Sequence, residues 1–218
     1  MDMDIAKGRK SAELLYRAFL KEGVHGETVM PEDLLPAGVK PGSLEHLLFI
    51  TLTVSIDYQR DAVTLWNNSR RTHEDPSTNY LFRPTELVNI PAAQIKQDMM
   101  KYKLSKKPDK DAWIWTTVAL SFLKKFDGDP RNLLSECSYR ADRILETLRS
   151  GQHLNRGRWE WDFPYLRGNK IGPLWVRMLR DNLGYDINNM ELMPIPVDVH
   201  IARATLALGV VRGHYKGN

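Results

Sequence analysis

The chain of 218 residues contains only one cysteine, Cys137. An intramolecular disulfide is therefore impossible, and the chain alone cannot supply cysteine ligands for a zinc site or an iron–sulfur cluster. Cys137 lies in an apolar pattern with helical spacing, which predicts a buried side chain in a reducing, intracellular protein. Two histidines and a carboxylate nowhere occur at metal-ligand spacing, so we expect neither a metal nor another cofactor.

Long apolar runs are also missing. No run approaches the roughly 18 residues needed to span a bilayer, and residues 1–10 lack the apolar segment of a signal peptide. We therefore expect no membrane partner and a cytoplasmic location. The net charge of +4 and the pI of about 9.1 are compatible with a nucleic-acid partner, although many basic proteins bind none.

Runs that alternate between apolar and polar residues are absent, whereas helical spacing recurs along the chain. Residues 44–54 are nearly all apolar and fit a buried helix or a buried strand, and their length favours the helix. Residues 67–80 are predicted to be a loop, 153–168 irregular and 190–196 extended. We expect an all-α protein of about nine or ten helices, over residues 11–21, 44–54, 62–66, 84–88, 91–100, 109–126, 132–148, 171–183 and 197–208.

The first segment that could carry chemistry is a turn ending in Gly168-Asn169-Lys170, which leads directly into a predicted helix. The positive end of the helix dipole disfavours an ammonium group there and so favours the neutral, nucleophilic amine of Lys170. The alternative is a surface lysine after a turn. Taken alone, so short a pattern favours that alternative.

The second segment is Ile195-Pro196-Val197-Asp198, followed by an apolar helical pattern. The prolines force an extended entry, which places Asp198 at the N-cap of the last helix. A carboxylate held there could stabilise a cationic transition state. It could also be an ordinary helix cap, and this second interpretation is favoured if the segment is taken alone.

Together, the two segments resemble the helix-hairpin-helix DNA glycosylases. The run Val197-Asp198-Val199-His200-Ile201-Ala202-Arg203 resembles the family's Val-Asp-x-His-Ile-x-Arg signature, and Gly168-Asn169-Lys170 resembles the Gly-x-Lys that ends its hairpin. Residues 195–198 are most similar to the archaeal 8-oxoguanine DNA glycosylases. Residues 47–55 resemble the family's apolar helix before the DNA-inserting loop, and 83–95 resemble its short helix pair, so the resemblance covers about residues 44–210.

The resemblance implies a fold of two helical subdomains flanking a cleft, with a helix-hairpin-helix-like turn. It implies a glycosylase core over residues 44–218 and an N-terminal helix and linker, residues 1–43, that contribute to the second subdomain. It also implies a monomer that binds double-stranded DNA with a flipped base and carries no iron–sulfur cluster. In a prokaryote such a protein would be associated with the nucleoid.

The activity implied is that of a DNA N-glycosylase with AP (β-elimination) lyase activity, which removes a damaged base, for instance an oxidised one, in base excision repair. Lys170 would attack C1′ of the flipped nucleotide, and Asp198 would stabilise the oxocarbenium-like transition state. We expect both side chains to open onto one cleft rimmed by basic residues. Gly168, Asn169 and His200 would contact the DNA or hold the site together.

Other residues are candidates for DNA or base binding. Asp57 and Tyr58 fall where relatives place a residue that fills the gap left by the flipped base, although a plain helix–helix loop is equally compatible. Arg158, Trp159 and Trp161 interleave charge and aromatic rings, which suits phosphate contacts and base stacking. The alternative, aromatic side chains anchoring a loop on the core, is favoured for at least one of the two tryptophans. The lysine-rich run 101–110 predicts a solvated loop.

The sequence also departs from the family. Leu166 occupies the place of the hairpin's first glycine, and Pro173 is unusual in the following helix. The altered hairpin raises the alternative of a non-catalytic nucleic-acid-binding relative. Residues 198–201 are also similar to the Asp-Tyr-Arg-Val helix of queuosine salvage proteins. The other alternative is therefore an N-glycosidase acting on a modified nucleoside or nucleotide, which would use Asp198 without Lys170.

Overall fold

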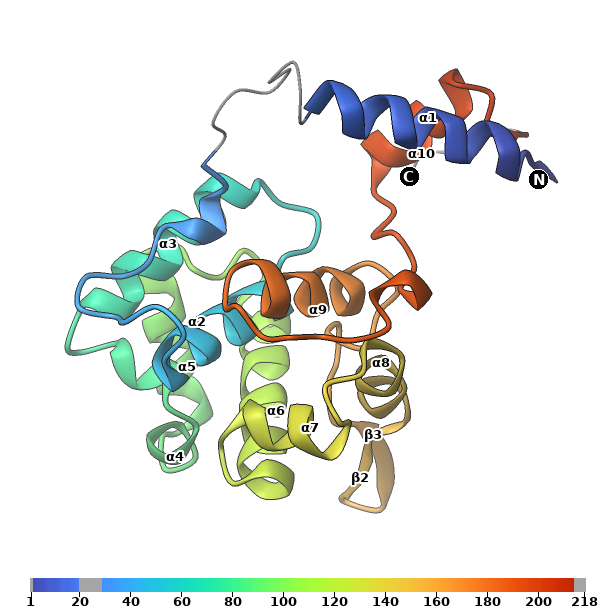
Figure 1. Ribbon diagram of the computed structural model, residues 1–218. Helices are drawn as coiled ribbons and strands as arrows, with labels where there is room; N and C mark the ends of the chain where they lie inside the picture. The colour runs from blue at the N-terminus through green and yellow to red at the C-terminus, as the bar shows by residue number, and fades with distance from the viewer. Residues whose placement is uncertain (1, 20–28, 214–218) are drawn as a thin grey trace. The chain divides into compact units, whose positions relative to one another are not determined.

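The computed structural model describes residues 2–19 and 29–213 (Figure 1). Over these residues the chain is mostly helical, which confirms the predicted helical class, with two small two-stranded sheets. No helix in this part of the chain is long and apolar enough to cross a membrane. The elements are β1 (Asp2–Met3), α1 (Ile5–Arg17), η2 (Pro31–Asp33), α2 (Leu44–Ser55), α3 (Ala62–Glu74), η3 (Asn79–Phe82), α4 (Pro84–Leu87), α5 (Ala92–Lys101), α6 (Pro108–Phe126), α7 (Pro130–Glu136), α8 (Ala141–Ser150), β2 (Gln152–Asn155), β3 (Arg158–Trp161), α9 (Ile171–Asp181), η4 (Met190–Leu192), α10 (Val199–Ala207) and β4 (Val211–Arg212).

By backbone contacts the chain divides into two compact units. Unit 1 comprises Met1–Met30 and Pro196–Asn218, and unit 2 comprises Pro31–Ile195. In unit 1, β1 pairs antiparallel with β4, so the N-terminal helix belongs with the C-terminal segment. The expected boundary at residue 43 falls inside unit 2. The two subdomains flanking a cleft stay a prediction.

The first helix begins earlier than its apolar pattern indicates. It starts at Ile5 rather than at residue 11, because the Asp4 side chain accepts a hydrogen bond from Lys7 N at 2.9 Å and caps the helix there. The polar residues that follow Asp4 lie on an exposed first turn. The predicted end of this helix, near residues 21–26, lies outside the described residues.

Helix α2 is central to unit 2. Every residue from His46 to Ser55 is buried, so the helix, and not the strand, is confirmed for this apolar run. Ser43 caps it by accepting a hydrogen bond from His46 N. Helix α2 packs against α3, α6 and α9 (Figure 1), and Trp175 Nε1 of α9 donates a buried hydrogen bond to Thr51 Oγ1 at 3.0 Å. This contact fixes α9, the helix that follows Lys170, against the core.

Helix α3 is longer than predicted, because residues 67–74 continue the helix and are not a loop. Its buried face includes Ser69, Thr72 and His73, which apolar spacing does not reveal. Ser69 shares a hydrogen bond with Thr53 of α2, and His73 Nε2 lies 3.2 Å from Glu45 Oε1 of the same helix, whereas Thr72 donates to Asn68 O within α3. Polar residues can occupy a buried helix face when each finds such a partner.

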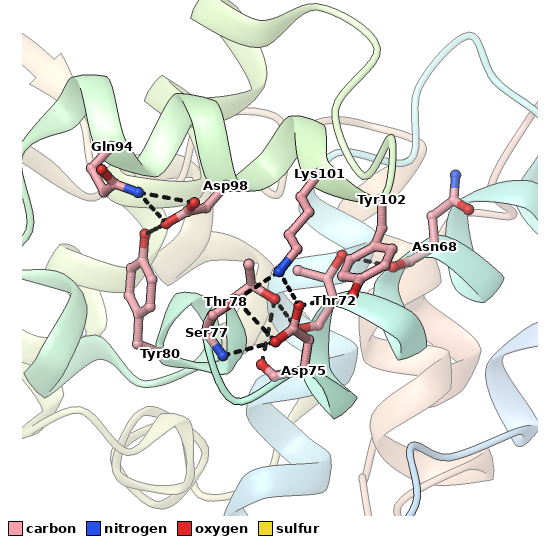
Figure 2. Close-up of polar contacts among 10 residues, drawn as sticks. All are labelled: Asn68, Thr72, Asp75, Ser77, Thr78, Tyr80, Gln94, Asp98, Lys101 and Tyr102. Carbon is pink, nitrogen blue, oxygen red and sulfur yellow. Dashed lines mark hydrogen bonds and ion pairs between the residues drawn. The ribbon is translucent and has the colours of Figure 1, made fainter.

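The end of α3 is joined to α5 by a polar network, which Figure 2 shows. Asp75 accepts hydrogen bonds from Ser77 N at 2.9 Å and Tyr102 Oη at 2.8 Å, and forms an ion pair with Lys101 at 2.6 Å. The Lys101 contact, aided by the other two, holds the pKa of Asp75 well below its usual range. Because its acceptors are satisfied within the network, we assign it to structure and not to chemistry.

The predicted helix 132–148 is wrong as a single element. It is divided into α7 and α8 at Ser138 and Tyr139, which adopt left-handed φ angles of 52° and 53°. The break is held by backbone pairing with a distant residue: Asn188 N donates to Tyr139 O, and Ala141 N donates to Asn188 O. Nothing local in the sequence signals that partner. Cys137, at the end of α7, is buried as predicted.

The segment predicted to be irregular contains a β-hairpin, so the expectation of no strands is also wrong. β2 and β3 pair antiparallel, with Leu154 opposite Trp159. Arg156 and Gly157 connect them with φ angles of 48° and 78°. Two consecutive positive φ angles are typical of a type I′ turn, which suits the twist of a two-residue hairpin. Gly157 was the local signal for this turn.

Candidate functional site

Lys170 lies at the junction between a tight turn and helix α9. The turn is anchored by Phe163 and Leu166, which are 1% and 0% exposed. A Cβ on Gly168 would lie 2.9 Å from Tyr165 O, and one on Gly172 would lie 2.8 Å from Leu166 O. Both glycines are therefore required by close backbone approach. The turn holds the half-buried Lys170 at a fixed position as the N-cap residue of α9.

The altered hairpin residue has a structural role. Leu166, at the position where the resembled motif has a glycine, is fully buried, and the left-handed conformation falls on Tyr165 with a φ of 63°. The amides of Leu166, Arg167 and Gly168 all donate within the turn, to Pro164 O, Phe163 O and Tyr165 O. These three N–H groups are therefore already used, and they do not point to a phosphate site of their own.

Asp57 lies at the end of α2 and is brought close to Lys170. It is 8% exposed, and within the described parts of the chain no side chain donates a hydrogen bond to it. Burial raises the pKa of Asp57, and the charges of Lys170 and Arg60 partly oppose this. The structure therefore brings two predicted site residues into electrostatic contact. Their side chains form no direct ion pair.

Tyr58, the next predicted residue, stacks on the turn that carries Lys170. Its ring lies 4.4 Å from that of Tyr165, and the Lys110 ammonium lies 5.0 Å and 4.8 Å from the two ring centres. The Tyr58 hydroxyl donates to the buried Asp111 carboxylate. Burial and this hydrogen bond raise the pKa of Tyr58 well above its usual value. Tyr58 is thus fixed against the turn, and its role in filling the gap left by a flipped base stays a prediction.

The lysine-rich run predicted to be a solvated loop contacts the loop that carries Asp57. Lys106 Nζ donates to Gln59 O at 2.8 Å, and Arg60 donates to Leu104 O at 3.0 Å. Beside them is a hollow of about 310 Å³. Three cations and one carboxylate are among the residues that line it, which are Arg60, Asp61, Thr64, Leu65, Asn68, Lys103, Ser105 and Lys106. This lining favours an anion such as a phosphate.

Asp111 holds Tyr58 and the lysine-rich run in place through hydrogen bonds. Its carboxylate is fully buried and accepts hydrogen bonds from the amides of Lys106 and Lys107 and from Ser105 Oγ, in addition to Tyr58. Burial alone would raise the pKa of Asp111, but these hydrogen bonds outweigh it and lower the pKa. Asp111 therefore remains an anion that positions the aromatic pair and the lysine run.

Asp198 is the N-cap of α10, as predicted. Its carboxylate accepts hydrogen bonds from His200 N and Ile201 N, both at 2.9 Å. Asp198 is half-buried, and His200 is exposed on the first turn of the helix. Asp198 belongs to unit 1 and Lys170 to unit 2. Their expected convergence on one cleft stays a prediction.

The remaining candidates lie around the β2–β3 hairpin and the turn. Trp159 is 70% exposed and Trp161 is 39% exposed, so neither anchors a loop in the core, contrary to the interpretation favoured for one of them. Arg158 is exposed as well. Asn169 is exposed and accepts a hydrogen bond from Arg149 at 3.3 Å.

Over residues 2–19 and 29–213, no group of three or more histidine, cysteine or acidic side chains could hold a metal ion. No model of a known protein family matches the chain, and no curated protein sequence matches it. The resemblance to DNA glycosylases therefore depends on the sequence motifs. The sequence did not single out Tyr165, Lys110 and Asp111 as site residues. The ring contacts of Tyr165 and Lys110, the left-handed conformation of Tyr165 and the hydrogen bond of Asp111 with Tyr58 leave no local pattern in the sequence.

Proposed function

We propose that this protein is a DNA N-glycosylase with β-lyase activity that removes a damaged base in base excision repair. The motif resemblance suggests this activity. The observation that carries it is the placement of Lys170 on a rigid turn beside the buried carboxyl group of Asp57. An amine fixed next to a buried carboxyl group is a suitable nucleophile, because the carboxylate can accept the ammonium proton.

The proposed reaction begins when Lys170 loses a proton, which passes to Asp57 through a bound water because the two side chains form no direct ion pair. The neutral amine attacks C1′ of a nucleotide that has left the base stack, and the bond between C1′ and the base breaks with its electrons passing to the base, which is then protonated. By resemblance, Asp198 stabilises the positive charge that develops on the sugar. The aminal formed at C1′ then loses a proton from nitrogen, and the C1′–O4′ bond breaks with its electrons passing to O4′, which is protonated. The resulting Schiff base loses a proton from C2′, and the electrons of that C–H bond expel the 3′ phosphate by β-elimination. Hydrolysis of the Schiff base then frees Lys170.

The surroundings of Lys170 support a nucleic-acid substrate. The Tyr58–Tyr165 pair, with the Lys110 ammonium over both rings, offers aromatic surface and positive charge next to the turn. The hollow lined by Arg60, Lys103 and Lys106 adds a second cationic surface. Cations that follow a phosphate backbone, together with aromatic rings, are the usual elements of nucleic-acid binding.

Borohydride trapping on a duplex with a preformed abasic site tests the proposal. The wild-type protein should form a covalent adduct with the DNA, and the Lys170→Ala variant should form none. Lys107→Ala is the matched control, because this ammonium lies 5.6 Å from the Tyr58 ring but outside the turn, and it should retain the adduct. Full trapping by Lys170→Ala would refute the assignment of the nucleophile.

Asp198→Asn tests the electrostatic part of the mechanism. Base release from duplexes that contain a damaged base should fall by about 10²- to 10³-fold, as for removal of a group that stabilises transition-state charge. Trapping at a preformed abasic site should fall less, because that step does not require base departure.

The same assays separate the two alternatives. Turnover of free modified nucleotides that survives in Lys170→Ala would support a nucleoside N-glycosidase. Salt-sensitive DNA binding by the wild-type protein without any adduct or base release would support a non-catalytic relative. The buried Leu166 in the turn before α9, where the resembled motif has a glycine, is the observation that favours this second alternative.

A further inference from the structure

The β2–β3 hairpin presents its apolar face outward. Residues paired across antiparallel strands point to the same face, so Leu154 and Trp159 share a face with Gln152 and Trp161. The exposed fractions of Leu154, Trp159 and Trp161 are 62%, 70% and 39%. The opposite face carries His153 and is partly covered. A hairpin that serves only to cap a core would have the reverse arrangement.

The base of the hairpin is held firmly. Asp162, which is 1% exposed, forms an ion pair with Lys125 and a hydrogen bond with His153 Nδ1, the latter at 2.9 Å. Lys125 Nζ also donates to Gln152 O at 3.0 Å, and Asp162 N donates to Gly151 O at 3.1 Å. An isolated two-stranded hairpin is only marginally stable in water. These contacts therefore preform the exposed face, which lowers the ordering cost when a ligand binds it.

Cations accompany the aromatic rings. The Arg167 guanidinium stacks on Trp161 at 3.6 Å from the ring centre. Arg156 is exposed at the hairpin turn, and Asp162 is already paired at the base of the hairpin. Arg158 is also exposed, but it lies on the opposite face of the hairpin, with His153. Arg167 also belongs to the turn that ends in Lys170. The hairpin face is thus rimmed by positive charge and joined by direct contact to the proposed catalytic turn.

We propose that this face, formed by Leu154, Trp159 and Trp161, binds an unpaired nucleobase, with the arginines contacting the adjoining phosphates. Base stacking on aromatic rings with arginine at the phosphates is the chemistry of single-strand recognition. In an intact duplex the flat faces of the bases are covered, whereas extrusion of a nucleotide uncovers them. The inference rests on the proposed function for its duplex substrate, but binding to a single strand would not require catalysis.

Fluorescence anisotropy with three labelled probes tests this inference: a single-stranded oligonucleotide, a duplex with a non-cleavable abasic-site analogue, and the intact duplex of the same sequence. Trp159→Ala should weaken binding to the first two about tenfold, as expected for loss of one stacked base, and change binding to the intact duplex less than twofold. Trp159→Phe should recover most of the affinity. Trp113→Ala is the matched control, because Trp113 is 45% exposed on α6, away from the hairpin, and should change none of the three.

Several outcomes would overturn the inference: unchanged binding of all three probes in Trp159→Ala, an equal loss on the intact duplex, or an equal loss in Trp113→Ala. Self-association or binding to anionic lipid vesicles that Trp159→Ala abolishes, with oligonucleotide affinity unaltered, would assign the face to another partner. Borohydride trapping at saturating DNA separates this result from the proposed function. Wild-type protein that traps, together with unchanged probe binding in Trp159→Ala, would refute the inference alone. Wild-type protein that binds single strands but never traps would refute the enzyme alone.

Discussion

Replacing Asp57 with asparagine should make the folded protein more stable at neutral pH. The side chain is 8% exposed and receives no side-chain hydrogen bond within the described residues, so its ionised form is held in an unfavourable environment. Asparagine has nearly the same shape and no charge. A residue whose replacement stabilises the fold while lowering activity is retained for function, and the Asp57 variant tests this directly.

The magnitude follows from two opposing contributions. A fully buried polar group without a partner costs about 1–3 kcal/mol. Asp57 lies at the lower end of this range, because its carboxylate is not among the buried polar groups left without a partner and keeps some contact with solvent. The charges of Lys170 and Arg60 offset part of this, but burial is the larger effect because the pKa of Asp57 is raised on balance. We therefore expect Asp57→Asn to raise the free energy of unfolding at pH 7.5 by about 1–2 kcal/mol. For a chain of this size, this corresponds to a rise in Tm of roughly 2–8 °C.

The effect should depend on pH with a definite sign. Because the pKa of Asp57 is raised in the folded state, the folded protein binds more protons than the unfolded chain between the two pKa values. The wild-type protein therefore loses stability as the pH rises through that window, and Asp57→Asn does not. The stability difference should be smallest near pH 4 and grow towards neutral pH.

Thermal unfolding followed by circular dichroism from pH 4 to pH 8 measures this difference. The matched control is Asp61→Asn on the same loop, because Asp61 is exposed and accepts hydrogen bonds from Thr64, which lower its pKa. The Asp61 contribution should be present above the ordinary carboxyl pKa and lost as the pH falls, the opposite dependence. A variant Asp57→Asn that is less stable at pH 7.5, or a difference independent of pH, would refute the reasoning.

Three other substitutions have defined expectations. Gly172→Ala should lower the free energy of unfolding by about 1–3 kcal/mol, because the new Cβ would overpack against Leu166 O, and it should also reduce Lys170-dependent trapping. The control Gly8→Ala, whose nearest contact is a side-chain methyl group at 3.1 Å, should leave the free energy of unfolding nearly unchanged in chemical denaturation. Asp162→Asn should cost about 1–3 kcal/mol and accelerate amide hydrogen exchange in residues 152–161, and unchanged exchange would disprove the anchoring role. Leu166→Ala should cost about 2–5 kcal/mol in urea unfolding, and a neutral result would mean that the turn is not anchored in the core.

Apolar spacing predicted the elements that are buried by apolar residues. Helix α2 is one example, because nearly every position of residues 44–54 is apolar and no other environment suits such a run. Apolar spacing did not predict the second half of α3, because Ser69, Thr72 and His73 occupy its buried face and a polar segment of this kind is typical of a loop. Their burial depends on hydrogen-bond partners elsewhere in the fold, and a local pattern cannot supply these.

Non-local pairing explains why the predicted helix 132–148 is divided into α7 and α8. Residues 132–148 have helical spacing without glycine or proline, and the chain nevertheless turns at Ser138 and Tyr139. Two left-handed residues are unfavourable in isolation, so the energy must come from the pairing with Asn188 and the packing around it. A residue about fifty positions away decides where the helix ends.

The candidate site was predictable where a residue's role follows from its position on a helix. Lys170 and Asp198 are both N-cap residues, as the adjoining glycines and prolines indicated. The electrostatic interaction of Lys170 with Asp57, and the stacking of Tyr58 on Tyr165, were not predictable. They depend on how α2 packs against α9, which is a property of the folded core.

Leu166 occupies a position where the resembled motif has a glycine, and this affects how the turn can bind a phosphate. With the amides of Leu166, Arg167 and Gly168 already bonded inside the turn, positive charge near Lys170 must come from side chains. The lysine run provides it: Lys110 lies over the tyrosine pair, and Lys106 contacts the loop of Asp57. Side-chain cations act over longer distances than backbone donors and are screened by salt. If this protein binds DNA, its affinity at the turn should therefore depend on salt through these lysines, and the buried side chain of Leu166 anchors the turn that carries Lys170.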